Sequence, residues 1–86
     1  MKLETSILNE FLVLEETNSF SKAARQLQIS QATLSRHIKQ LEDLYGICLF
    51  ERTTQKIKLT PYGESLVPYA RSILETERSF KQDVER

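Results

Sequence analysis

The sequence predicts a mainly α-helical domain with three short helices, a two-stranded β hairpin and a long final helix. Three observations support this prediction. Apolar residues recur at helical spacing over the first half of the chain, short alternating segments follow Gly46, and apolar residues in the last third are spaced by three and four. The 86 residues suffice for one small domain with a modest core.

The first helix is expected over residues 5–17, where five apolar residues recur at helical spacing. Thr5 or Ser6 is the expected N-cap. Three glutamates of this helix are expected to face water: Glu10, Glu15 and Glu16. The polar segment "TNSFS" then favours a turn.

The second helix is expected over residues 22–28, with Ser21 as its N-cap. A very short connection leads to a third helix at about 31–44, which Ser30 is placed to cap. Ile29 and Leu34 have the spacing of a hydrophobic staple. The short connection predicts a helix-turn-helix.

Gly46 is placed to end the third helix in a left-handed conformation. The expected buried stripe of this helix consists of Leu34, Ile38, Leu41 and Tyr45. The face opposite the stripe offers small and hydrogen-bonding side chains together with positive charge: Gln31, Ala32, Ser35, Arg36 and Lys39. Such a face suits the DNA major groove, although a solvated helix face is the alternative.

Segments 48–53 and 56–60 predict two short strands. Thr60 and Pro61 then suit the cap and first position of the final helix, 61–86. Apolar residues on one face of that helix predict a seam for a partner helix: Leu66, Ala70, Ile73, Phe80 and Val84. Glu77 is the one poor fit on this face. No capping signal precedes Arg86, so we expect the helix to be truncated there.

The formal net charge is zero, but residues 22–58 hold seven basic and three acidic side chains, a net charge of +4. Positive charge in this segment favours an anionic partner. Free backbone N–H groups at Ser21 and Ser30 suit phosphate groups. A solvated positive surface is the alternative reading.

Other chemistries find little support in the sequence. One cysteine and one histidine exclude an internal disulfide and cannot complete a zinc site, so we expect no metal and no cofactor. We see no nucleophile–base pair and no glycine-rich phosphate loop, so catalytic residues and an enzyme are not expected. No apolar segment is long enough to span a membrane, and we expect a cytoplasmic protein.

Four motifs together resemble the DNA-binding domain of LysR-type transcriptional regulators. They are "SFSKAA", the helix pattern S-Q-x-x-x-S-R-x-I-x-x-L-E, the turn G-x-x-L-F-E-R-T, and "LTPYG". The resemblance implies a winged helix-turn-helix over 1–60, with a wing at about 49–59, and a linker helix over 61–86 that pairs two subunits. The expected partners are double-stranded DNA and a second copy of this chain. A full-length protein could also form a tetramer. A small-molecule effector would act only through a domain absent from this chain.

The resemblance also assigns roles to single residues. Base contacts are implied for Gln31, Ala32, Thr33, Ser35 and Arg36. Phosphate contacts are implied for Ser21, Lys39, Arg52 and Thr54, and wing contacts fall on Gln55 and Lys56. The chain departs from the family at two of these positions: Ala32 stands where proline is common, and Gln55 where the wing tip commonly carries arginine.

Two functions are weighed on this basis. The first is sequence-specific DNA binding by a dimeric regulator on a partly palindromic operator. The alternative is a protein-interaction module that dimerises through the final helix without binding DNA.

Overall fold

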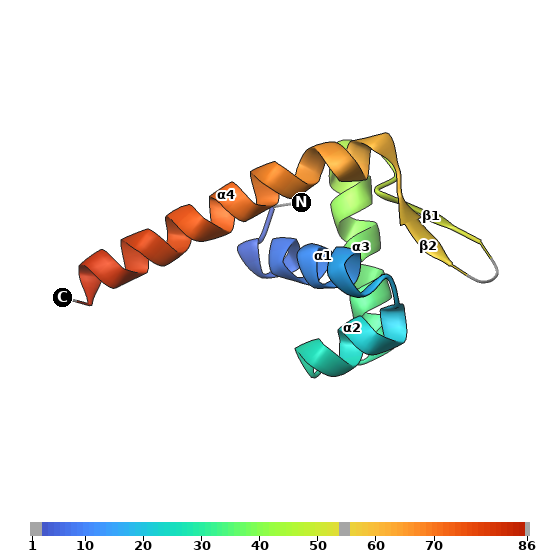
Figure 1. Cartoon of the computed structure of the whole chain (residues 1–86), viewed down its shortest axis with the longest axis horizontal. Helices are drawn as coiled ribbons and strands as arrows, with labels where there is room; N and C mark the ends of the chain where they lie inside the picture. Colours follow the sequence, from blue (N-terminus) through green and yellow to red (C-terminus); the bar gives the residue numbers. More distant parts are fainter. Residues whose placement is uncertain (1–2, 54–55, 86) are drawn as a thin grey trace.

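The computed structural model describes residues 3–53 and 56–85 of the chain. In chain order the elements are α1 (Thr5–Thr17), α2 (Phe20–Leu27), α3 (Gln31–Tyr45), β1 (Phe50–Arg52), β2 (Ile57–Leu59) and α4 (Pro61–Val84). The first three helices lie together, the hairpin projects from one side, and α4 extends away on the other (Figure 1). The predicted fold class, three helices with a two-stranded wing and a long final helix, is confirmed.

Three predicted helix ends are confirmed in atomic detail. The Ser30 hydroxyl accepts a hydrogen bond from the backbone N–H of Thr33 at 3.0 Å, and the Thr60 hydroxyl accepts one from Gly63 at 3.1 Å. Gly46 ends α3 with a φ of 66°, a left-handed conformation that a residue with a side chain adopts at a cost. Local capping chemistry therefore sets both ends of α3 and the start of α4.

Two other predicted caps are wrong. Neither Thr5 nor Ser6 caps α1, whose N-cap residue is Glu4 and makes no side-chain hydrogen bond. The cap of α2 is Ser19 rather than Ser21: its hydroxyl accepts from the backbone N–H of Lys22 at 3.2 Å. Both serines of "SFS" can cap a helix. Capping from Ser19 begins α2 two residues earlier than predicted.

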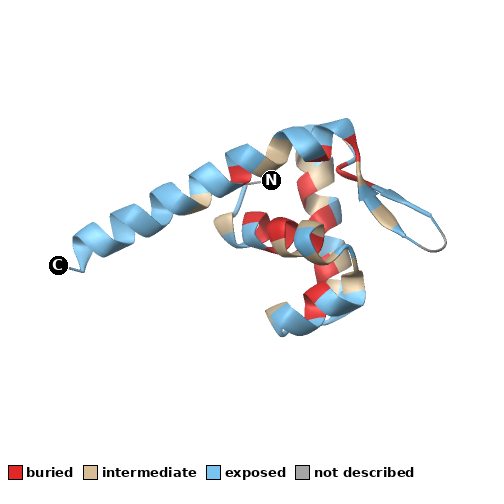
Figure 2. Ribbon diagram, viewed as in Figure 1, coloured by how far each residue is buried: buried red, intermediate tan, exposed pale blue. Residues whose placement is uncertain are grey.

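The core lies where α1 meets the other helices, since α1 contacts α2, α3 and α4 (Figure 2). It consists of Ile7, Leu8, Phe11, Leu12, Leu14, Ala23, Ala24, Leu34, Ile38, Leu41, Leu49, Phe50 and Ala70. The rings of Phe11 and Phe50 pack with their centroids 5.5 Å apart, tilted by 56°. This contact joins the first helix to the first strand of the hairpin.

Three predictions of exposure or burial fail. Glu10 is buried and Glu15 half-buried, whereas both were expected in water with Glu16, which is exposed. Tyr45 was expected in the buried stripe of α3 but is 54% exposed. Leu49 and Phe50, from the chain that follows α3, belong to the core, whereas Tyr45 in the last turn of α3 does not.

The hairpin is antiparallel, and it pairs Phe50 with Leu59 and Arg52 with Ile57. At its base the Thr60 hydroxyl donates a hydrogen bond to the carbonyl oxygen of Cys48 at 2.6 Å. Cys48 itself is exposed. The same threonine caps α4, so one side chain joins the segment before the wing to the helix after it.

The first half of α4 belongs to the core, which corrects part of the predicted seam. Ala70 is fully buried and Leu66 packs against the core, so Ala70 is unavailable to a partner helix. Ile73, Phe80 and Val84 are exposed as the seam requires, at 38%, 68% and 66%. Beyond Ala70 the helix is almost entirely exposed (Figure 2).

Candidate nucleic-acid interface

The candidate interface begins with the outer face of α3. Leu34, Ile38 and Leu41 are buried, so the opposite face of the helix turns outward. Of the predicted base-contacting residues, Gln31, Ala32 and Arg36 are exposed, while Thr33 and Ser35 are half-buried. The face is therefore accessible along the first two turns, where a groove-binding helix makes its base contacts.

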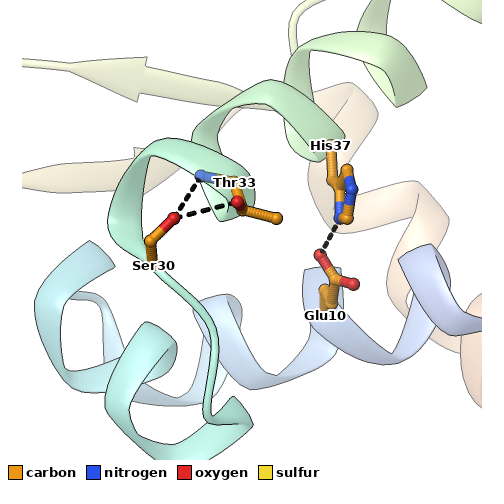
Figure 3. A network of polar contacts seen from close by, with 4 residues as sticks. All are labelled: Glu10, Ser30, Thr33 and His37. Atoms are coloured by element: carbon orange, nitrogen blue, oxygen red, sulfur yellow. Dashed lines mark hydrogen bonds and ion pairs between the residues drawn. The ribbon is translucent and has the colours of Figure 1, made fainter.

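Ser30 and Thr33 organise the N-terminus of this helix (Figure 3). Besides accepting from the Thr33 backbone, the Ser30 hydroxyl donates to the Thr33 hydroxyl oxygen at 2.9 Å. The backbone N–H of Thr33 is thus already paired, so a phosphate near Ser30 would use other N–H groups of the first turn. Thr33 thus supports the start of α3 through its backbone N–H and its hydroxyl group.

Lys39 extends the exposed face by one further turn. Its ammonium group lies 3.2 Å from Asp43 on the same helix, and both side chains are largely exposed. An exposed pair at this spacing contributes little to stability and opens at little cost. Lys39 is therefore accessible to solvent, and its phosphate contact stays a prediction.

A shallow cleft brings three predicted residues from separate elements together. Ser21 lies at the start of α2, Gln31 at the start of α3 and Lys56 directly before β2, and all three line this cleft. Its remaining lining residues are Asn18, Ser19, Phe20, Thr53 and Ile57. Two helix N-termini and a lysine at one concave surface favour an anion.

Arg52 is held at the edge of this surface by an aromatic ring. Its guanidinium carbon lies 5.0 Å from the centroid of Phe20. A cation over an aromatic face at this distance is attracted by the ring's quadrupole. Phe20 thus places the positive charge of Arg52 next to the start of α2, where Ser21 is predicted to contact a phosphate.

The hairpin is closed by a threonine. The Thr53 hydroxyl donates to the Lys56 carbonyl oxygen and accepts from the Lys56 backbone N–H, both at 3.0 Å. Thr54 and Gln55, predicted for phosphate and wing contacts, lie outside the described residues. Their predicted roles stay predictions.

Sequence reasoning missed the carboxylate that joins α3 to the wing. Glu42 Oε2 accepts hydrogen bonds from the backbone N–H groups of Leu49 at 2.7 Å and Phe50 at 3.4 Å. It also missed Ser19 and the stacking of Phe20 on Arg52. The spacing of Ser19 to Lys22 was a usable signal for the Ser19 cap. Nothing in the local pattern reveals the other two contacts, which join distant segments of the chain.

Two other kinds of site were sought in residues 3–53 and 56–85. No group of three or more His, Cys, Asp and Glu side chains there could hold a metal ion. None of the helices in these ranges is long and apolar enough to cross a membrane.

Comparison with known proteins agrees with this geometry. Residues 7–64 match the model of the lysR family of bacterial regulatory helix-turn-helix proteins. The HTH-type transcriptional regulator HdfR of Yersinia pestis (strain Pestoides F) is 43% identical over 82 residues, 95% of this chain and 28% of the relative. The chain thus spans less than a third of the curated relatives it matches.

Solved structures give the same assignment. The DNA-binding domain of BenM in complex with catB site 1 DNA is 37% identical with a TM-score of 0.92, and the match covers 98% of this chain and 94% of that one. Vibrio fischeri DarR, solved in complex with DNA, is 33% identical with a TM-score of 0.93, covering 99% of this chain and 29% of that one. The chain belongs to the lysR family of bacterial regulatory helix-turn-helix proteins.

Proposed function

We propose that this chain is the sequence-specific DNA-binding part of a transcriptional regulator. The outer face of α3 reads base edges in the major groove, and the cleft beside the wing positions the phosphate backbone. The observation that carries the proposal is the solvent-accessible face of α3 formed by Gln31, Ala32 and Arg36, on a helix whose N-terminus is capped by Ser30. BenM and DarR, which share the fold, were solved bound to DNA.

Roles within the interface follow from chemistry. Gln31 can pair with adenine, Arg36 can pair with guanine or hold a phosphate, and the Ala32 and Thr33 methyl groups can touch thymine. Lys39 and Arg52 are placed for phosphates, as are the N–H groups near Ser21 and Ser30. We propose that residues 1–60 carry these contacts.

We further propose that residues 61–86 pair two copies of the chain. One helix-turn-helix touches few bases, so two symmetric copies supply most of the discrimination. Support comes from the apolar side chains that α4 leaves exposed, among them Ile73, Phe80 and Val84. The relatives are named as transcriptional regulators, and we therefore assign a binding role in the cytoplasm rather than catalysis.

The test begins with selection of bound duplexes from a random library by the wild-type chain. The selected duplex is then titrated by fluorescence anisotropy at several salt concentrations, with Arg36→Ala as variant. We expect binding to weaken steeply with salt and Arg36→Ala to cost about 1–3 kcal/mol, the range for one good base contact. Arg71→Ala, an exposed arginine of α4, is the matched control and should bind like the wild type.

The opposite result is equally informative. A folded dimer that enriches no duplex and binds none even at low salt contradicts DNA recognition. The alternative, a module that only self-associates through α4, would then stand.

A further inference from the structure

Glu10 and His37 form a contact that the proposed DNA-binding role leaves unexplained. Glu10 lies on the buried side of α1, and its side chain is 12% exposed. A carboxylate is rarely buried without a partner, because the loss of hydration is costly. Its partner is His37 Nδ1, 2.8 Å from Glu10 Oε1 (Figure 3). With the carboxylate as acceptor, Nδ1 is the donor.

The contact connects the scaffold to the candidate reading helix. Within residues 3–53 and 56–85 it is the one side-chain hydrogen bond that joins α1 to α3. His37 directly follows Arg36 in the chain and lies one turn after Thr33. Its side chain is 26% exposed, so the pair lies at the border between the core and the outer face.

The three residues that α3 buries in the core, Leu34, Ile38 and Leu41, are apolar. Apolar contact is non-directional, so it holds two helices together more firmly than it fixes their rotation. A hydrogen bond depends on both distance and angle. The pair therefore adds directional information that Leu34, Ile38 and Leu41 do not supply.

Small rotations of α3 matter greatly for base recognition. A helix with its side chains has a radius of roughly 5–6 Å, so a rotation of about 20° moves its outer atoms by about 2 Å. Hydrogen bonds to base edges tolerate far less, since N–H···O distances lie between about 2.7 and 3.2 Å. Phosphate attraction is less directional and survives such a shift.

We infer that Glu10, through its hydrogen bond to His37, fixes the rotation of α3 and is a positioning residue for base discrimination. The inference rests on the proposed DNA-binding function. Neither side chain needs to touch a base. Removing the contact should lower sequence discrimination while salt-dependent binding to any duplex is kept.

The test compares the selected duplex with a scrambled duplex of the same composition. For each protein the ratio of the two dissociation constants is measured at one salt concentration. Glu10→Leu should lower this ratio about tenfold, the loss expected for roughly one base contact, and leave the scrambled duplex bound as before. Glu10→Gln, which keeps an acceptor for Nδ1, should restore discrimination. Glu16→Leu, an exposed glutamate of the same helix, is the control.

If the contact between Glu10 and His37 only stabilised the fold, a variant that stays folded without it would discriminate between the two duplexes as well as the wild type does. Replacing a buried polar pair by apolar side chains is often neutral or stabilising, so the double variant Glu10→Leu, His37→Leu should stay folded by circular dichroism. It keeps the fold and lacks the directional contact, and we expect reduced discrimination from it too. This variant decides the question if Glu10→Leu alone fails to fold.

The outcomes separate the inference from the function beneath it. If the wild type discriminates between the duplexes and the folded variants discriminate equally well, the inference is wrong and the proposed function stands. If the wild type itself shows no discrimination, the proposed function is wrong and the inference falls with it.

Discussion

At the scale of single residues, Glu42 joins the two parts of the candidate interface. Its carboxylate accepts from two backbone N–H groups in the segment that enters the wing, across seven and eight residues. Hydrogen bonds to charged groups are stronger than those between neutral groups. Glu42 thereby fixes where the wing begins relative to the end of α3.

Glu42→Ala should lower the free energy of unfolding by about 1–3 kcal/mol, because two partly buried N–H groups lose their acceptor. Urea denaturation followed by circular dichroism measures this. Asp43→Ala, which removes only the exposed contact with Lys39, should change stability by less than about 0.5 kcal/mol. Equal midpoints for the two variants would contradict the role given to Glu42.

Side-chain partners are what the sequence predicted least well. Ser30 and Thr60 could be predicted as caps because a cap bonds a group three residues away. The partner of Glu10 is 27 residues distant, and that of Glu42 is a backbone segment beyond a turn. Helical periodicity placed Glu10 in water because it contains no information about a histidine on another helix.

At the scale of elements, the helices, strands and turns follow from local chemistry, and most were predicted. The bounds of α1 match the prediction, and α3 differs from it by one residue. The strands are shorter than the predicted segments, since each keeps only three paired residues. The packing partner of α4 was not predictable, because an apolar stripe on a helix can pack against the core of its own chain or against a partner helix.

The start of α4 lies very close to the wing, and Gly63 makes this possible. A Cβ atom at Gly63 would overlap the carbonyl oxygen of Leu49 and lie 2.6 Å from Leu59 Cδ2. A backbone carbonyl cannot move aside as a flexible side chain can. The contact between α4 and the hairpin therefore requires a residue without a side chain.

Gly63→Ala should destabilise the chain by about 1–3 kcal/mol through overpacking. The sign is the decisive part, because alanine in place of glycine in an open helix stabilises by about 1 kcal/mol. Thermal unfolding measures the difference, with Ser65→Ala, an exposed position two residues on, as control. A raised melting temperature for Gly63→Ala would show that α4 does not pack against the wing.

At the scale of the whole molecule, α4 carries two adjacent apolar stripes with different expected partners. One stripe, which includes Ala70 and Leu74, packs within the chain. The other remains exposed and consists of Tyr62, Tyr69, Ile73, Phe80 and Val84. These five residues are spaced by seven and four, which places them on one side of the helix. Tyr62 and Tyr69 thus join the proposed seam, and Leu66 and Ala70, which pack against the core, leave it.

Phe80→Glu should convert a dimer into a monomer, because it places a charge within the exposed stripe. Sedimentation equilibrium measures the association. Gln82→Glu introduces the same change of charge about 200° around the helix and should leave association intact. If both variants remain dimeric at the same concentration, the stripe is not the pairing surface.

The burial of Ala70 also bears on how the chain is made by the ribosome. The helix-turn-helix is synthesised first, but one wall of its core comes from residues 66–74, which emerge later. A nascent chain that has released only its first sixty residues leaves the apolar side of α1 partly open to water. The part that we propose to read DNA therefore completes its folding only after much of α4 has left the exit tunnel.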